Sequence, residues 1–164
     1  MKEYQFMEVS LACSDCEEMV RFFEQIFDAK VIFRGRMMGE PFARIVANGI
    51  TYAFRQQTDF AAPEADFFFR NHLGVRVADL ENAVAALKER GAKFVLDPEM
   101  VKGLQKGKSD GGTPMLETTW VAEPLTLESL PTSGYKNDVA ILEGPDHLYI
   151  ELNEVEMPEG VDWF

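Results

Sequence analysis

Residues 8–15 read EVSLACSD, and residues 72–79, which begin 64 positions later, read HLGVRVAD. Each segment begins with a side chain that can bind a metal or carry a proton and ends on an aspartate. Between them, apolar residues alternate with small or polar residues for six positions. Alternation with a period of two predicts a half-buried β-strand, and the aspartate is a good N-cap for a following helix. Because the segment occurs twice, we expect two related modules.

The residues that follow each segment extend the repeat. Both segments precede an apolar stripe with helical spacing and then three further alternating stretches. The helices are predicted at 16–28 and 80–90, and the further strands at 29–34, 42–47, 50–55, 92–96, 138–143 and 147–153. The order in each module is βαβββ. We therefore predict an α+β fold in which two modules form a curved mixed sheet around a central cleft, with the helices outside.

An insertion at residues 97–137 separates the strands of the second module and carries Lys102, Lys106 and Lys108 in an otherwise acidic chain. A non-repeating segment of this length is either a lid over a site, where the lysines would meet an anionic substrate, or a solvated surface loop. The predicted division is a first module at 1–59, a linker at 60–67, a second module at 68–154 and a C-terminal tail at 155–164.

The charge and hydropathy of the chain limit its partners. The 164 residues carry a formal net charge of -12, which argues against nucleic acid and anionic membrane surfaces, because both are polyanions. The sequence contains neither the apolar run of a signal peptide nor a stretch of about 18 apolar residues that would span a membrane. We expect a cytoplasmic protein that binds a small-molecule substrate, and the apolar ending at Trp163 and Phe164 suggests a homodimer.

Cys13 and Cys16 form a C-x-x-C motif, which has two interpretations. It is either a redox pair or half of a zinc site, or it is a small apolar residue at a strand end followed by a residue in the first helical turn. A tetrahedral zinc site needs two further ligands at matching spacing, and no second C-x-x-C exists in the chain. The second interpretation is therefore favoured.

The two βαβββ modules resemble those of the vicinal oxygen chelate superfamily, which includes glyoxalases, bleomycin resistance proteins and extradiol dioxygenases. Residues 144–152, GPDHLYIEL, are similar to the ending of the second module in that family. The resemblance implies that metal ligands lie on the first and last strand of each module. The corresponding residues here are Glu8, His72 and Glu151, and Ala53 falls at the fourth position.

Strand parity agrees with this ligand set. His72 and Arg76 share one strand face, as do Tyr149 and Glu151, and these faces lie opposite the apolar residues expected to pack on the helices. Two carboxylates brought together need a cation, and two carboxylates with an imidazole suit Mn, Fe, Co, Ni or Zn. We predict a divalent metal at Glu8, His72 and Glu151.

Further residues are predicted to surround that site. Arg76, Tyr149 and Tyr52 are expected to contact the substrate, whereas Arg44 is interpreted as surface charge. His147 is either a second imidazole near the site or a solvated residue at the mouth of the last hairpin.

These predictions lead to two functional hypotheses. The first is a metal-dependent lyase, isomerase or dioxygenase that acts on a substrate with vicinal oxygens, with Glu8 or Glu151 as the catalytic proton carrier. The second is a non-catalytic small-molecule binding protein similar to the bleomycin resistance proteins. The empty fourth ligand position at Ala53 favours the second hypothesis, and the placement of the three predicted ligands favours the first.

Overall fold

The computed structural model describes residues 7–62, 72–100 and 136–156. Most of the predicted linker, insertion and tail, including the three lysines of the insertion, lies outside the described residues. None of the helices in the described ranges combines the length and the apolar character needed to cross a bilayer. The chain divides into two compact units: the first comprises Met1–Asn71, Leu87–Lys93 and Glu143–Tyr149, and the second comprises His72–Ala86, Phe94–Leu142 and Ile150–Phe164.

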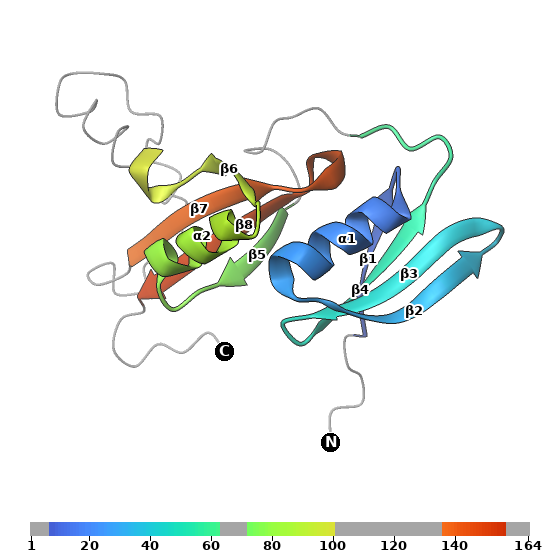
Figure 1. Cartoon of the computed structure of the whole chain (residues 1–164), viewed down its shortest axis with the longest axis horizontal. Helices are drawn as coiled ribbons and strands as arrows, with labels where there is room; N and C mark the ends of the chain where they lie inside the picture. Colours follow the sequence, from blue (N-terminus) through green and yellow to red (C-terminus); the bar gives the residue numbers. More distant parts are fainter. Residues whose placement is uncertain (1–6, 63–71, 101–135, 157–164) are drawn as a thin grey trace, which may run out of the picture. The chain divides into compact units, whose positions relative to one another are not determined.

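The first sheet has four strands in the order β1-β4-β3-β2 and one covering helix (Figure 1). Its elements are β1 (Val9–Cys13), α1 (Cys16–Phe27), β2 (Lys30–Met37), β3 (Glu40–Ala47) and β4 (Ile50–Gln56). β1 runs parallel to β4, and the other two pairs are antiparallel. Asn48 and Gly49 form the tight turn between β3 and β4, both with positive φ, as their sequence predicts. The βαβββ order of the first module is confirmed.

Helix α1 begins and ends where its sequence predicts. The Asp15 side chain accepts hydrogen bonds from the backbone N–H groups of Glu17 and Glu18, which satisfies donors that have no partner within the helix. Asp28 adopts a left-handed conformation and terminates the helix. The buried stripe of α1 consists of Cys16, Met19, Val20, Phe23 and Ile26. Burial of this stripe against the sheet stabilises the helix, which is too short to be stable alone.

Strand pairing assigns each side chain of the first sheet to one of two faces. Ile45 pairs with Tyr52 on the face that packs against α1, whereas Arg44 pairs with Ala53 on the opposite face. We call this opposite face the distal face of the first sheet. Paired positions assign to it the side chains of Ser10, Phe33, Phe42, Arg44, Thr51, Ala53 and Arg55.

The second sheet repeats the arrangement, with the strand order β5-β8-β7-β6. Its elements are β5 (His72–Arg76), α2 (Leu80–Glu89), β6 (Lys93–Leu96), β7 (Lys136–Glu143) and β8 (Tyr149–Glu156). The Asp79 carboxylate accepts a hydrogen bond from the N–H of Asn82, as expected of a helix cap, and the N–H of Leu80 donates to Glu154. The α+β fold class with two βαβββ modules is therefore confirmed.

The connection between β7 and β8 is a short 3-10 turn, η3 (Pro145–His147), in place of a simple hairpin. Asp146 and His147 both have left-handed backbone conformations. The Asp146 carboxylate accepts hydrogen bonds from the N–H and the hydroxyl of Ser14, at 2.8 and 2.6 Å. These bonds attach the turn to the start of α1 within the first unit.

Candidate functional site

The second unit brings together His72 and Glu151, two of the three predicted metal ligands. His72 is the first residue of β5, and its Nε2 lies 3.3 Å from Oε2 of Glu151 on β8. Glu151 points away from its neighbours Ile150 and Leu152, which are buried on the other face of the strand. Both side chains of the pair are partly exposed. An imidazole and a carboxylate on neighbouring strands therefore share one partly open face.

The separation of these two groups fits a divalent ion. Metal–ligand distances of about 2.0–2.2 Å place two adjacent ligand atoms roughly 3 Å apart, and the two side-chain atoms lie 3.3 Å apart. A neutral imidazole with a carboxylate is a donor set that Mn, Fe, Co, Ni and Zn all accept. The separation of the two atoms therefore matches two adjacent coordination positions of such an ion.

Glu8, the third predicted ligand, pairs with an arginine of its own unit. Its Oε2 accepts a hydrogen bond from Nε of Arg44 at 2.8 Å. The Glu8 side chain is 19% exposed and that of Arg44 is 35% exposed. Arg44 lies on the inner strand β3 and is partly exposed, and the positive charge that the sequence assigned to it is paired with Glu8.

A complete ligand cluster is not formed by the described residues. Among residues 7–62, 72–100 and 136–156, no three His, Cys, Asp or Glu side chains make a group that could hold a metal ion. Glu8 belongs to the first unit, and His72 and Glu151 belong to the second. The three-residue metal site remains a prediction, and Ala53 contributes only a buried methyl group at the fourth position.

The three residues expected to contact a substrate occupy different environments. Tyr52 is only 6% exposed and packs against Phe23 of α1, and burial raises the pKa of its hydroxyl. The alternation of β4 turns Tyr52 away from Ala53, so it belongs to the core beneath α1, and its predicted role in substrate contact is corrected here. Tyr149 is buried on the strand face that carries Glu151, and Arg76 is exposed at the end of β5. Their roles remain predictions.

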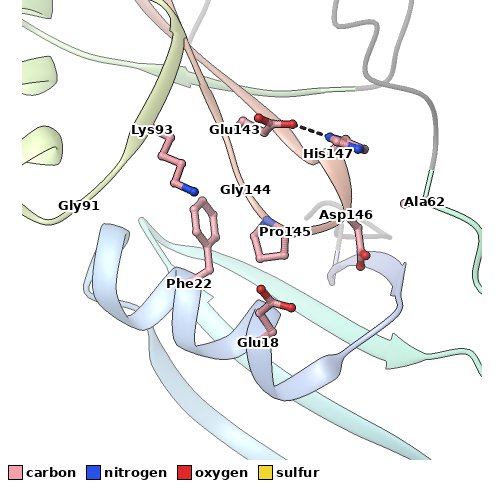
Figure 2. A pocket seen from close by; sticks show the side chains of 10 residues that line it. All are labelled: Glu18, Phe22, Ala62, Gly91, Lys93, Glu143, Gly144, Pro145, Asp146 and His147. Carbon is pink, nitrogen blue, oxygen red and sulfur yellow. Dashed lines mark hydrogen bonds and ion pairs between the residues drawn. The ribbon is translucent and has the colours of Figure 1, made fainter.

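The first unit also contains a cavity of about 490 Å³ beside the β7–β8 turn (Figure 2). His147 Nδ1 is within hydrogen-bond distance of Glu143 at its edge. The Phe22 ring packs against Gly144, where a Cβ atom would lie 2.8 Å from the ring. The lining residues are Glu18, Phe22, Ala62, Gly91, Lys93, Glu143, Gly144, Pro145, Asp146 and His147. The sequence did not predict this cavity, because segments that are distant along the chain form it. The only local signal was an acidic residue, Glu143, four positions before His147 at the same turn.

Both cysteines are buried and reduced. Cys13 has no exposed surface, and burial, then the nearby Cys16 and the carboxylate of Asp146, raise the pKa of the Cys13 thiol to about 12. Burial also raises the pKa of the Cys16 thiol. Cys13 ends β1 and Cys16 begins α1, and both are buried, so their predicted placement at a strand end and in the first helical turn is confirmed.

Comparison with known proteins gives a family for this arrangement. The family model of the glyoxalase/bleomycin resistance protein/dioxygenase superfamily matches residues 5–106. The chain belongs to this superfamily. No curated protein matches the chain. The family assignment agrees with the duplicated βαβββ order and with the resemblance inferred from the sequence.

Solved structures of the superfamily share the fold at low sequence identity. A glyoxylase/bleomycin resistance protein/dioxygenase domain from Frankia sp. EAN1pec is 21% identical, with a TM-score of 0.57, over 93% of this chain and 98% of that one. A glyoxalase family protein from Enterococcus faecalis is 15% identical, with a TM-score of 0.59, over 94% and 100%. The fosfomycin resistance protein FosX from Listeria monocytogenes, complexed with Mn(II) and sulfate, is 11% identical, with a TM-score of 0.56, over 92% and 91%.

Proposed function

We propose that this chain is a divalent-metal-dependent enzyme, a lyase, isomerase or dioxygenase, that acts on a small substrate with two neighbouring oxygens. The observation that carries the proposal is the His72–Glu151 pair, whose side-chain atoms lie 3.3 Å apart. Membership of the superfamily and the Mn(II) complex of the similar FosX protein support a metal at this position.

In this proposal three residues of the chain have separate roles in metal binding and proton transfer. His72 and Glu151 hold the ion, and Glu8 is the third ligand or the group that accepts and returns a substrate proton. The chemistry that the ion supplies when bound is Lewis-acid stabilisation of negative charge on the two substrate oxygens. The Glu8 carboxylate accepts a hydrogen bond from Arg44. In either role, Glu8 must give up this hydrogen bond to contact the ion or the substrate.

The proposal is tested by metal binding to protein purified without a chelator. We expect about one divalent ion per chain by elemental analysis, and Mn(II) binding by calorimetry. His72→Ala and Glu151→Gln should each weaken that binding by at least about 100-fold, since the loss of an outer-shell partner alone costs about 10–100-fold. His147→Ala is the matched control, because His147 also pairs with a glutamate, and it should change nothing. Absence of stoichiometric metal in the wild-type protein would overturn the proposal.

A second candidate function is non-catalytic binding of a small molecule. It is favoured by the engagement of Glu8 with Arg44 and by Ala53, which offers no ligand atom at the fourth position. Thermal-shift measurements separate the two functions, because a ligand that binds only the folded protein raises its melting temperature. Stabilisation by organic cations but not by divalent metals would favour this binding function.

The assembly and location expected from the sequence remain proposals. A homodimer predicts twice the 18.6 kDa chain mass in light scattering coupled to size-exclusion chromatography, and a monomer mass would contradict it. Fractionation of cells that express the protein tests the expected cytoplasmic location.

A further inference from the structure

The cavity beside the β7–β8 turn (Figure 2) is separate from the residues of the proposed function. All of its lining residues belong to the first unit, and Glu8, His72 and Glu151 are not among them. Two of the lining residues, Glu18 and Phe22, lie on α1, the helix that covers the sheet face opposite the distal face. A volume of about 490 Å³ is large enough for a small organic molecule.

Two of the charged groups on this cavity are available to a ligand. Glu143 and Asp146 already have partners, because Glu143 pairs with His147 and Asp146 accepts two hydrogen bonds at the start of α1. In the part of the chain that the structure describes, no protein group pairs with the Glu18 carboxylate or with the Lys93 ammonium group. Both of these residues are exposed, so a ligand can reach them from solvent.

The Phe22 ring forms an apolar wall beside these two charges. In Figure 2 the ring lies between the Lys93 ammonium group and the Glu18 carboxylate, and Glu18 is its neighbour one turn earlier on α1. Two other phenylalanines of α1 contact the ring, at centre-to-centre distances of 5.5 and 6.1 Å. Gly144 leaves room for the ring, since a Cβ atom there would lie 2.8 Å from it. A wall that is already in place reduces the ordering that binding requires.

We propose that this cavity binds a small organic zwitterion, with its ammonium group at Glu18, its carboxylate at Lys93 and its hydrocarbon part against Phe22. A simple anion would meet the carboxylates of Glu143 and Asp146 as well as that of Glu18, and a simple cation would be repelled by Lys93. A molecule that carries both charges satisfies both groups. The site goes beyond the proposed function, because it requires no metal and none of the predicted metal ligands.

The probes are γ-aminobutyrate and ε-aminocaproate, titrated into the full chain at constant ionic strength while amide signals are followed by NMR. EDTA is present, so that the probes cannot bind through a metal ion. The signals of Gly91 and Gly144, two glycines that line the cavity, should shift saturably, and the tighter probe reports the span between the two charges. Propylamine and butyrate, which each carry one of the charges, should bind about fivefold more weakly, the upper end of what an exposed ion pair contributes.

Single substitutions test the two charged groups. Glu18→Gln and Lys93→Met should each weaken binding of the tighter probe about fivefold. Glu17→Gln and Lys30→Met are the matched controls, because both residues are exposed in the same unit and neither lines the cavity. The controls should leave the affinity unchanged.

An exchange of the two charges separates ligand contact from a structural effect. Glu18→Lys and Lys93→Glu should each abolish measurable binding, whereas the variant with both changes should regain most of it, because a zwitterion can bind in the reverse orientation. His72→Ala separates this site from the metal proposal, since zwitterion binding should persist after metal binding is lost. Absence of a saturable shift at Gly91 and Gly144 in the wild-type protein, equal affinity for propylamine or butyrate, or no recovery in the exchanged variant would overturn the inference.

Discussion

The two modules place different chemistry at positions that the repeat makes equivalent. Glu8 opens the first module and meets Arg44 of the same unit, whereas His72 opens the second and meets Glu151. Both contacts lie on the sheet face away from the helix of their module. In the first module the carboxylate is paired with a guanidinium group, and in the second the carboxylate is paired with an imidazole.

The difference follows from one position on the last strand. Glu151 supplies a carboxylate on β8, while the corresponding residue of β4 in the repeat is Ala53. With no second donor in the first module, Glu8 is neutralised by Arg44, which lies opposite Ala53. The two modules share the backbone arrangement and the helix caps. They differ in the partner of the residue that opens each module, which is an arginine in the first and a glutamate in the second.

The largest expected effect tests the cores of the two modules. Phe23→Ala should lower the free energy of unfolding by about 3–5 kcal/mol, because Phe23 packs against Tyr52 and Phe54 in the centre of the first unit. Val84→Ala in α2 should cost only about 2 kcal/mol, since it removes two methyl groups. Urea unfolding of each variant provides the measurement, and a cost for Val84→Ala as large as that for Phe23→Ala would contradict this expectation.

A smaller effect is expected at Glu8 when Mn(II) affinity is measured by calorimetry. Glu8→Gln should weaken binding by about tenfold, or about 1.4 kcal/mol, less than the loss expected for His72→Ala, because the metal must compete with Arg44 for the carboxylate. Arg44→Met should strengthen binding a few-fold by releasing Glu8. If Glu8→Gln costs as much as His72→Ala, the two halves of the site contribute equally and the comparison fails.

The helix caps should show no difference between modules. Asp15→Ala and Asp79→Ala each remove a carboxylate that accepts backbone hydrogen bonds at a helix start, so each should lower stability by about 1 kcal/mol. Thermal or urea unfolding measures both. A difference well above 1 kcal/mol between the variants would indicate that the caps, too, have diverged.

The smallest effect concerns the buried thiols of the first module. The pKa of Cys13 is raised from 9.0 to about 12 in the folded protein, so its stabilising contribution is complete below pH 9 and is lost as the pH rises toward 12. The loss amounts to about 0.4 kcal/mol at pH 9 and grows above it. Unfolding measured from pH 7 to pH 10 should decline less steeply in Cys13→Ala, and equal slopes would contradict the assignment.

The sequence predicted the features that depend on local signals. Residues adjacent in the sequence determine three of these features: the cap at Asp15, the turn at Asn48-Gly49 and the period-two alternation of the strands. The structure contains each of them as predicted. Parity also placed Glu151 and His72 on the faces away from the helices. The same rule should have excluded Tyr52, which precedes Ala53 and must point the opposite way.

Features that depend on contacts between distant residues were not predictable. Glu8 and Arg44 are 36 positions apart, and nothing in either neighbourhood indicates that the arginine would turn inward to the glutamate. The turn at Pro145–His147 likewise places His147 against Glu143 because two consecutive residues adopt left-handed conformations. Tertiary contacts, in place of local preference, select both arrangements.

The central claim is that the second module retains the metal-binding half of the site. An anomalous-diffraction map of crystals soaked in Mn(II) tests it most directly. The account predicts a peak within coordination distance of His72 Nε2 and Glu151 Oε2 and no peak at Glu143 and His147. A folded, Mn(II)-soaked crystal without a peak at His72 and Glu151, or with its only peak at the other His–Glu pair, would contradict it.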